Sequence, residues 1–190
     1  MDILKKKLIL ASQSPRRQQL LSQAGFNFEV KIKPIDEVFP EDMPVDEVAG
    51  YLAKQKAEAA RAFITSDEII LTADSVVILG NTIFGKPTDF DDARRILRAL
   101  SGKTHRVITG CCLLSKDKES VFSGESTVEF GPLSDEEIDF YIQAYKPYDK
   151  AGAYAIQEWI GLCKIHRIEG TYANIMGLPV DLVYRELAGF

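Results

Sequence analysis

The sequence contains few cysteines, and their arrangement suggests neither a cross-link nor a metal. The three cysteines, Cys111, Cys112 and Cys163, are odd in number, two are adjacent, and none forms a CxxC pair. A disulfide framework and a zinc site are therefore not indicated. Buried thiols in a reducing cytosol are the simplest interpretation.

Long hydrophobic runs and concentrated positive charge are also missing. The apolar run before Ser12 is only four residues long, which is too short for a signal peptide or a membrane span. The formal net charge is −5 and there is no basic tail, which argues against a partner bound through nucleic-acid phosphates. We therefore expect a cytoplasmic protein that binds neither membranes nor nucleic acids. A free nucleotide needs only a local charged patch and stays open as a ligand.

Common catalytic signatures are absent as well. The sequence has no GxGxxG, no GxxxxGK[ST], no HExxH and no GxSxG motif. Its two histidines, His105 and His166, have no evident acidic partner, and a lone histidine in a strand is more often structural than catalytic. A serine hydrolase triad is not excluded by this, but nothing indicates one.

The sequence does contain enough apolar residues for a substantial core, with 46% hydrophobic residues in a chain of 190. Strand and helix patterns alternate without repeats or linkers, so we expect one α/β domain over residues 1–190. The strands are expected at 8–11, 26–32, 69–79, 82–84, 105–114, 120–130 and 162–168. The helices are expected at 16–23, 45–63, 88–100, from a capping box of Ser134 and Glu137 to before Pro147, and from about 180 onward.

The first expected strand leads into an unusual helix start. Ser14 is a candidate N-cap, Pro15 suits the first helical position, and Arg16 and Arg17 occupy the first turn. Cations at a helix N-terminus oppose the macrodipole unless an anion lies in front of it. The hydroxyls of Ser12 and Ser14 with the two guanidiniums therefore suggest a phosphate site. An ordinary turn with two solvated arginines is the alternative.

Two lysines lie in the helix expected over 45–63. Its apolar stripe consists of Val48, Tyr51, Leu52, Ala59 and Phe63. Lys54 falls on the opposite face and is expected to be solvated. Lys56 lies at the edge of the stripe, so geometry favours Lys56 if either lysine has a chemical role.

Asp74 stands in an apolar strand pattern, where an ionised carboxylate needs solvent, a cation or a chemical role. If residues 80–81 form a two-residue hairpin loop, Val77 lies opposite Phe84. That register brings Lys86 beside Asp74, although a following proline limits the pairing.

The polar inventory suits one type of reaction. The cations are Arg16, Arg17, Lys56 and Lys86, and the carboxylates are Asp36, Glu37, Asp74 and Asp149. Such a set can hydrolyse a phosphoanhydride with Mg²⁺ or Mn²⁺, because cations neutralise phosphates and carboxylates hold the metal or activate water.

The chain resembles the Maf family of nucleoside triphosphate pyrophosphatases over nearly its whole length. Six blocks in order carry the resemblance: LASQSPRR at 10–17, ADSVV at 73–77, GKP at 85–87, SG at 101–102 with His105, DKAGAY at 149–154 with IQ at 156–157, and GLP at 177–179. The resemblance implies an α/β fold with a mixed twisted sheet, flanking helices and two lobes around a central cleft, of the Maf and inosine triphosphatase kind. The family commonly dimerises, so a homodimer is among the implied assemblies.

The resemblance also implies roles for individual residues. It makes Asp74 the proton acceptor that activates water for attack at the α-phosphorus, which leaves a nucleoside monophosphate and pyrophosphate. It places Glu37 near the metal, which Asp74 also binds. The implied substrate-binding residues are Ser12, Ser14, Arg16, Arg17, Lys56, Lys86 and Gln157, and those that set base specificity are Arg16, Ser75 and Gln157.

The pattern is similar to the branch that acts on dTTP and UTP. The branch that acts on 7-methyl-GTP usually has Trp before the arginines. Ser75 stands where the first branch usually has Thr, and Ala155 where Gly is usual, so we expect retained activity with looser base selection. Two alternatives stay open: a pyrophosphatase for modified nucleotides such as 7-methyl-GTP, 5-methyl-UTP or pseudo-UTP, and a nucleotide-binding module linked to septum formation that has no turnover.

Overall fold

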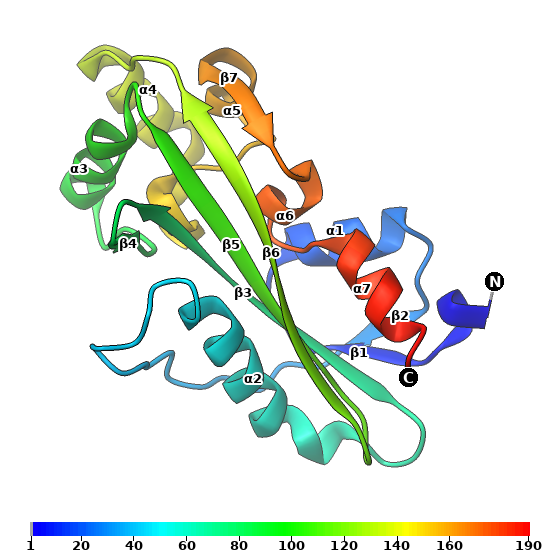
Figure 1. Cartoon of the computed structure of the whole chain (residues 1–190). Helices are drawn as coiled ribbons and strands as arrows, with labels where there is room; N and C mark the ends of the chain where they lie inside the picture. The colour runs from blue at the N-terminus through cyan, green and yellow to red at the C-terminus, as the bar shows by residue number, and fades with distance from the viewer. Residues whose placement is uncertain (1) are drawn as a thin grey trace. The chain divides into compact units, whose positions relative to one another are not determined.

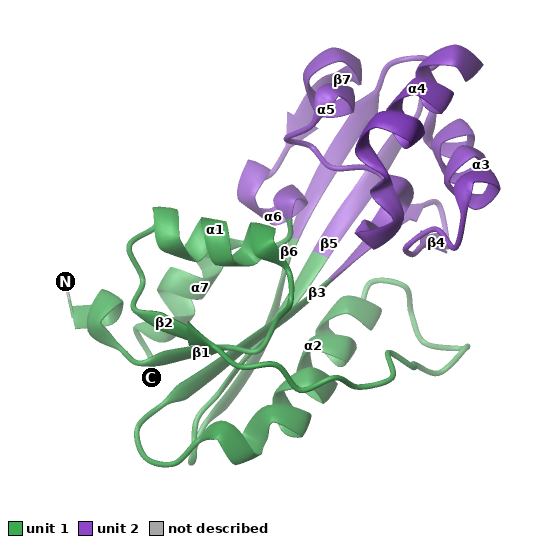
Figure 2. Ribbon diagram, turned by 180° about the vertical axis from the view of Figure 1, so that it is seen from behind, with its two compact units in different colours: residues 1–74, 109–124, 177–190 green, residues 75–108, 125–176 purple. Residues whose placement is uncertain are grey.

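The computed structural model describes residues 2–190, which divide into two compact units (Figure 2). Unit 1 contains the described residues up to Asp74 together with residues 109–124 and 177–190, and unit 2 contains residues 75–108 and 125–176. The strands β3 (Ile69–Leu79), β5 (Thr104–Leu114) and β6 (Glu119–Phe130) contribute residues to both units. Within residues 2–190 no helix has the length and apolar character that a membrane crossing requires.

The strands form a mixed sheet. Across residues 2–190 it has seven strands in the order β2-β1-β3-β5-β6-β7, with β4 paired to β3 off this path. β1 (Leu8–Leu10) is parallel to β2 (Phe28–Val30) and to β3. β4 (Thr82–Phe84) is antiparallel to β3, and β7 (Ile165–Glu169) is antiparallel to β6. The predicted α/β fold with a mixed sheet and flanking helices is confirmed.

The helices of unit 1 pack through small side chains. They are α1 (Pro15–Gln23), α2 (Val48–Ala60) and α7 (Val180–Leu187), with 3-10 turns η1 (Asp2–Lys5) and η2 (Arg61–Phe63). Figure 1 shows α2 lying along β3, and Ala53, Ala57 and Ala60 of α2 are buried against Ile70 of β3. Alanine side chains leave little space between helix and sheet, so the polar groups of α2 and β3 can meet.

A glycine in β5 lets α2 come this close. A Cβ atom at Gly110 would lie 2.2 Å from the backbone nitrogen of Gly50 and 2.3 Å from the carbonyl carbon of Ala49. Such contacts are far inside van der Waals range, so any other residue at position 110 would push the first turn of α2 away from the sheet.

Unit 2 is built around Tyr141, a fully buried aromatic residue in α4. Its helices are α3 (Phe90–Leu100), α4 (Asp135–Tyr145), α5 (Trp159–Lys164) and α6 (Tyr172–Met176), with 3-10 turns η3 (Pro147–Asp149) and η4 (Ala151–Ala153). The predicted capping box of Ser134 and Glu137 is present at the start of α4. Asp89 caps α3 by accepting from the amide of Asp92 at 2.8 Å.

The hairpin prediction is confirmed, because Val77 lies opposite Phe84 and Leu79 opposite Thr82. The strand prediction for 162–168 is wrong in its first half. Residues 162–164 complete α5, since the carbonyl of Glu158 accepts from the amide of Leu162 and fixes a helical turn there. Cys163 is consequently exposed, not buried as predicted.

Candidate active site

Asp74 is positioned by the alternation of side chains along β3. Residues two apart in a strand share a face, so Thr72 and Asp74 both point toward α2. The Thr72 hydroxyl donates to the carbonyl oxygen of Ala53 at 2.6 Å, and the Asp74 carboxylate accepts from the ammonium of Lys56. Asp74 is only 8% exposed. It is a nearly buried carboxylate whose main compensation is an ion pair with Lys56.

Lys56 connects two carboxylates. It follows Ala53 by three residues and lies on the face of α2 that packs on β3. Its Nζ lies 2.8 Å from Oε1 of Glu37, which belongs to the segment between β2 and α2, and also contacts Asp74. Lys54, as predicted, lies on the exposed face, where its Nζ is 2.6 Å from Oε1 of Glu119.

The donor set around Lys56 fits a divalent cation bound together with substrate. Glu37 and Asp74 both direct carboxylate oxygens to one point of positive charge. Among residues 2–190 no cluster of three or more His, Cys, Asp and Glu residues could hold a metal. Mg²⁺ is nevertheless commonly held by one or two carboxylates and completed by substrate phosphates and water. Two carboxylates are therefore sufficient in chemical type and number.

The turn between β1 and α1 is organised by the hydroxyl of Ser12, which is 8% exposed. Its Oγ accepts from the amide of Ser14 at 3.2 Å and from Nη1 of Arg17 at 3.2 Å. Arg17 also donates from Nε to the carbonyl of Gly177 at 2.8 Å. Ser14 holds the N-cap position of α1 as predicted, but its side chain makes no capping hydrogen bond.

Arg17 is a desolvated cation. Burial lowers the pKa of its guanidinium, the charge of Asp74 opposes that shift, and the nearby Arg16 adds to it. The neighbouring thiol of Cys111 is neutral, because burial raises its pKa to about 12. A guanidinium that has lost much of its hydration gains strongly from an anion, and Arg16 lies half-buried beside it in the first turn of α1.

The remaining predicted site residues belong to unit 2. Ser75 is half-buried and follows Asp74 directly in β3, and Lys86 lies exposed in the segment after β4. Strand pairing ends at Phe84, two residues before Lys86, so the predicted approach of Lys86 to Asp74 stays a prediction. Gln157 is half-buried, and its Oε1 is fully shielded with no hydrogen-bond partner among residues 2–190.

Comparison with known proteins places this geometry in a family. The family model described as Maf-like protein matches residues 7–190. The chain belongs to the Maf-like protein family. It is 50% identical over 194 residues to a dTTP/UTP pyrophosphatase of Porphyromonas gingivalis, covering 100% of this chain and 98% of the relative. It is 52% identical over 187 residues to a dTTP/UTP pyrophosphatase of Phocaeicola vulgatus, covering 98% and 97%. Among solved structures, the Ham1 protein of Staphylococcus aureus is similar with a TM-score of 0.49 and 14% identity, over 66% of this chain and 72% of that chain.

This Maf-like chain contains a buried polar network that the sequence did not reveal. In unit 2, the Tyr141 hydroxyl bonds to both Ala155 and Glu158, on either side of Gln157. His105 is structural, as predicted: its Nε2 lies 2.7 Å from the Tyr154 hydroxyl, and burial lowers its pKa to about 4. In the sequence, the only sign of this network is the presence of Tyr141 and Glu158 among apolar residues. Such pairs are common, so they do not predict a contact.

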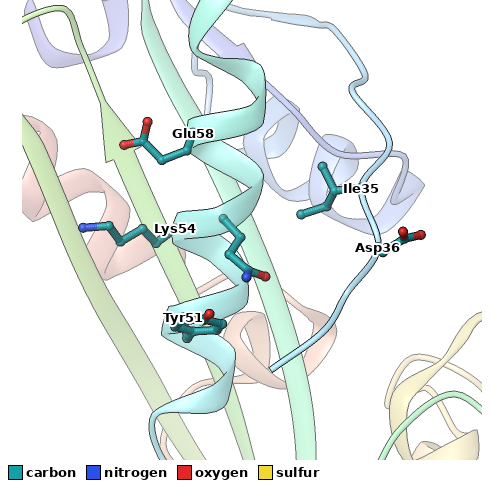
Figure 3. A pocket seen from close by; sticks show the side chains of 6 residues that line it. Ile35, Asp36, Tyr51, Lys54 and Glu58 are labelled. Carbon is teal, nitrogen blue, oxygen red and sulfur yellow. The ribbon is translucent and has the colours of Figure 1, made fainter. Parts of the chain in front are cut away.

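The Maf-like chain also has a pocket of about 410 Å³ on the outer face of α2 (Figure 3). Tyr51, Lys54 and Glu58 line it from the helix, and Ile35 and Asp36 line it from the preceding segment. Neither Lys56 nor Asp74 is among its lining residues. The pocket is therefore separate from the ion-paired cluster, which faces β3.

Proposed function

We propose that this protein is a nucleoside triphosphate pyrophosphatase that hydrolyses dTTP and UTP to the nucleoside monophosphate and pyrophosphate. The observation that carries the proposal is the nearly buried Asp74 paired with Lys56, which also pairs with Glu37. It occurs in a chain about half identical to relatives named dTTP/UTP pyrophosphatase.

Asp74 is the proposed general base. An ionised carboxylate only accepts hydrogen bonds, so it can orient a water molecule and take its proton as the water oxygen attacks the α-phosphorus. The bond between the α-phosphorus and the bridging oxygen breaks, and pyrophosphate leaves with that oxygen. Lys56 supports this role because its ammonium donates a hydrogen bond to the carboxylate and fixes its direction.

The β1–α1 turn is the proposed triphosphate-binding element. Arg17 is desolvated and already donates to Ser12 and Gly177, so its orientation is fixed before substrate arrives. Arg16, Ser12 and Ser14 present further donors from the same turn. We propose that Lys56 and Lys86 complete the positive charge around the phosphates.

A divalent cation is the proposed cofactor, held by Glu37 and Asp74. When bound, it would neutralise charge that develops on the phosphate oxygens. Lys56 compensates the same two carboxylates in the free protein, which would otherwise lie close together without a counter-charge. Removal of divalent ions with a chelator is expected to abolish turnover, and Mg²⁺ or Mn²⁺ to restore it.

Base recognition is assigned to Gln157, with Arg16 and Ser75. The side-chain oxygen of Gln157 can accept a hydrogen bond, and the N3–H group of uracil and thymine can donate one. Cytosine carries an acceptor at the same ring position. Ser75 retains a hydroxyl but lacks the methyl group of threonine, which favours a less restrictive base site.

A substrate panel with the purified protein tests the proposal. Pyrophosphate release is measured with dTTP, UTP, CTP, the purine triphosphates, 7-methyl-GTP, 5-methyl-UTP and pseudo-UTP, each with Mg²⁺ or Mn²⁺. The proposal requires the highest kcat/KM for dTTP and UTP. Faster turnover of a modified nucleotide would favour the alternative substrate class, and stoichiometric binding without turnover would leave a nucleotide-binding module.

A further inference from the structure

Lys56 lies between the two carboxylates that are proposed to hold the divalent cation. Its Nζ is 2.8 Å from Oε1 of Glu37 and also contacts Oδ1 of Asp74. An ammonium group and a divalent cation both bind carboxylate oxygens, so the two compete for these oxygens. In the free protein, the lysine therefore already takes up the oxygens that the cation needs.

The two carboxylates differ in how firmly the chain holds them. Asp74 belongs to β3 and is nearly buried. Glu37 lies at the centre of a tight turn, in which the amide of Val38 donates to the carbonyl of Asp36 at 3.1 Å, and its side chain is 39% exposed. Two carboxylates that approach each other repel, and the ammonium of Lys56 offsets this repulsion in the free protein.

A second cation lies within electrostatic range of the same carboxylates. Burial lowers the pKa of the Arg17 guanidinium, and the charges of Asp74 and Glu37 both oppose that shift. Lys56 and Arg17 thus balance the charges of Glu37 and Asp74 without a metal. A divalent cation gains little from two carboxylates whose charge is already compensated, because it also meets the repulsion of the nearby ammonium.

We propose that Lys56 is an internal counter-ion that keeps the affinity of the free protein for divalent cations low, so that the cation binds appreciably only together with the triphosphate. The inference rests on the proposed function. A triphosphate brings several negative charges, which offer Lys56 and Arg17 further anionic partners and offset their repulsion of the cation. Metal and substrate therefore bind with positive coupling.

Binding of Mn²⁺ to the free protein tests the inference, measured without nucleotide by isothermal titration calorimetry and electron paramagnetic resonance. Lys56→Met removes the competing charge and should bind Mn²⁺ at least about tenfold more tightly than the wild type. Lys54→Met removes the same charge from the exposed face of the same helix, where Lys54 pairs with Glu119, and should match the wild type. Turnover by Lys56→Met should fall, so that metal affinity and activity change in opposite directions. A site that had merely collapsed would lose both.

Two further measurements locate the effect. Adding Glu37→Gln to Lys56→Met should remove the gain in Mn²⁺ affinity, because the tighter site needs both carboxylates. Adding the analogue α,β-imido-dUTP, which cannot be cleaved at the α-phosphorus, should increase the Mn²⁺ bound to the wild type, as measured by water proton relaxation. The increase should be smaller in Lys56→Met, which binds the ion without a nucleotide.

Circular dichroism and thermal melting establish that the variants are folded, and Lys56→Gln replaces Lys56→Met if the latter is not. Equal or weaker Mn²⁺ binding by the folded Lys56 variant, an equal gain in Lys54→Met, or a gain that survives Glu37→Gln would overturn the inference. So would an analogue effect as large in the Lys56 variant as in the wild type. Absence of pyrophosphate release from dTTP and UTP by the wild type would instead overturn the proposed function. The Mn²⁺ titrations involve no turnover, so the two failures are distinguishable.

Discussion

The predicted site residues of the two units differ in how the chain satisfies them. In unit 1, Asp74 is paired with Lys56, and Arg17 donates to Ser12 and Gly177. In unit 2, the Oε1 of Gln157 is shielded from solvent without a partner among residues 2–190, although a dense network surrounds it. Unit 1 compensates its buried charges within the chain, whereas neutral side-chain oxygens without a partner in the described chain occur in both units, at Gln55 and at Gln157.

This difference suggests that one set of residues governs the rate of hydrolysis and another the choice between nucleotides. A buried charge is too costly to leave uncompensated, so unit 1 must supply partners for its charges whichever nucleotide is present. A neutral amide carries a smaller penalty when it is unsatisfied, about 1–3 kcal/mol, and its hydrogen-bonding groups discriminate between bases by donor and acceptor pattern. We therefore expect changes at Asp74 and Lys56 to slow all substrates alike, and changes near Gln157 to alter the ratios between substrates.

The largest effect is expected from Asp74→Asn. Loss of the proton acceptor should lower kcat about 1,000-fold for every nucleotide, with the UTP to CTP ratio unchanged. Pyrophosphate release and thermal melting measure the two quantities, with Asp117→Asn on the surface as the control. Near-normal turnover by folded Asp74→Asn would remove the residue from the chemistry.

A matched pair of lysines provides the second test. Lys56→Met should lower kcat/KM about 100-fold for UTP and CTP alike, because it removes a positive charge near the phosphates and leaves Asp74 without its counter-ion. Lys54→Met, in the same helix, should stay within about twofold of the wild type, since its exposed pair with Glu119 contributes little. Equal losses in both variants would contradict the assignment.

Gln157→Ala tests the other side of the comparison. The UTP to CTP ratio of kcat/KM should fall at least about tenfold, while kcat for UTP changes less than the ratio. Gln55→Ala is the control, because Gln55 also has a shielded Oε1 without a partner in the described chain but lies in α2. Were Gln55→Ala to change the ratio equally, an unsatisfied amide would not by itself identify the base site.

The smallest effect is expected in the pH dependence of stability, and it should come from unit 2. His105 has a pKa near 6.5 when unfolded and about 4 when folded, because burial disfavours its charged form. The stability that neutral His105 contributes is therefore complete above pH 6.5 and is lost as the pH falls toward 4. The loss in free energy of unfolding reaches about 2 kcal/mol at pH 5. Urea unfolding at pH 7 and pH 5 should show this loss in the wild type and in His166→Gln, but not in His105→Gln. An equal loss in His105→Gln would assign the pH dependence to other groups.

Features that depend on residues close together in the sequence were predicted correctly. The two-residue loop fixed the β3–β4 register, and the capping box located the start of α4. The helix period correctly placed Lys54 on the outside. The same period wrongly placed Tyr51 on the buried face, where it is in fact 37% exposed. The buried face of α2 is formed mainly by small alanine side chains, not by large apolar ones.

Contacts that depend on how deeply elements pack could not be predicted. The sequence suggested that Lys86 lies beside Asp74, which stays a prediction, but it did not indicate the pairing of Asp74 with Lys56. That contact requires α2 to lie close to β3, and this depth is set by a glycine in a third element, β5. The network of Tyr141 with Ala155 and Glu158 was missed for the same reason, since it joins segments separated in sequence by a turn of irregular backbone.

The glycine at position 110 has a consequence for how this protein tolerates change. Its missing side chain sets the height of α2 above the sheet, and the reach of Lys56 to Asp74 depends on that height. In a saturation screen for activity, position 110 should therefore be as intolerant as Asp74, although it carries no functional group. A variant library aimed at new substrates should vary the segment around Gln157 and leave this spacing intact.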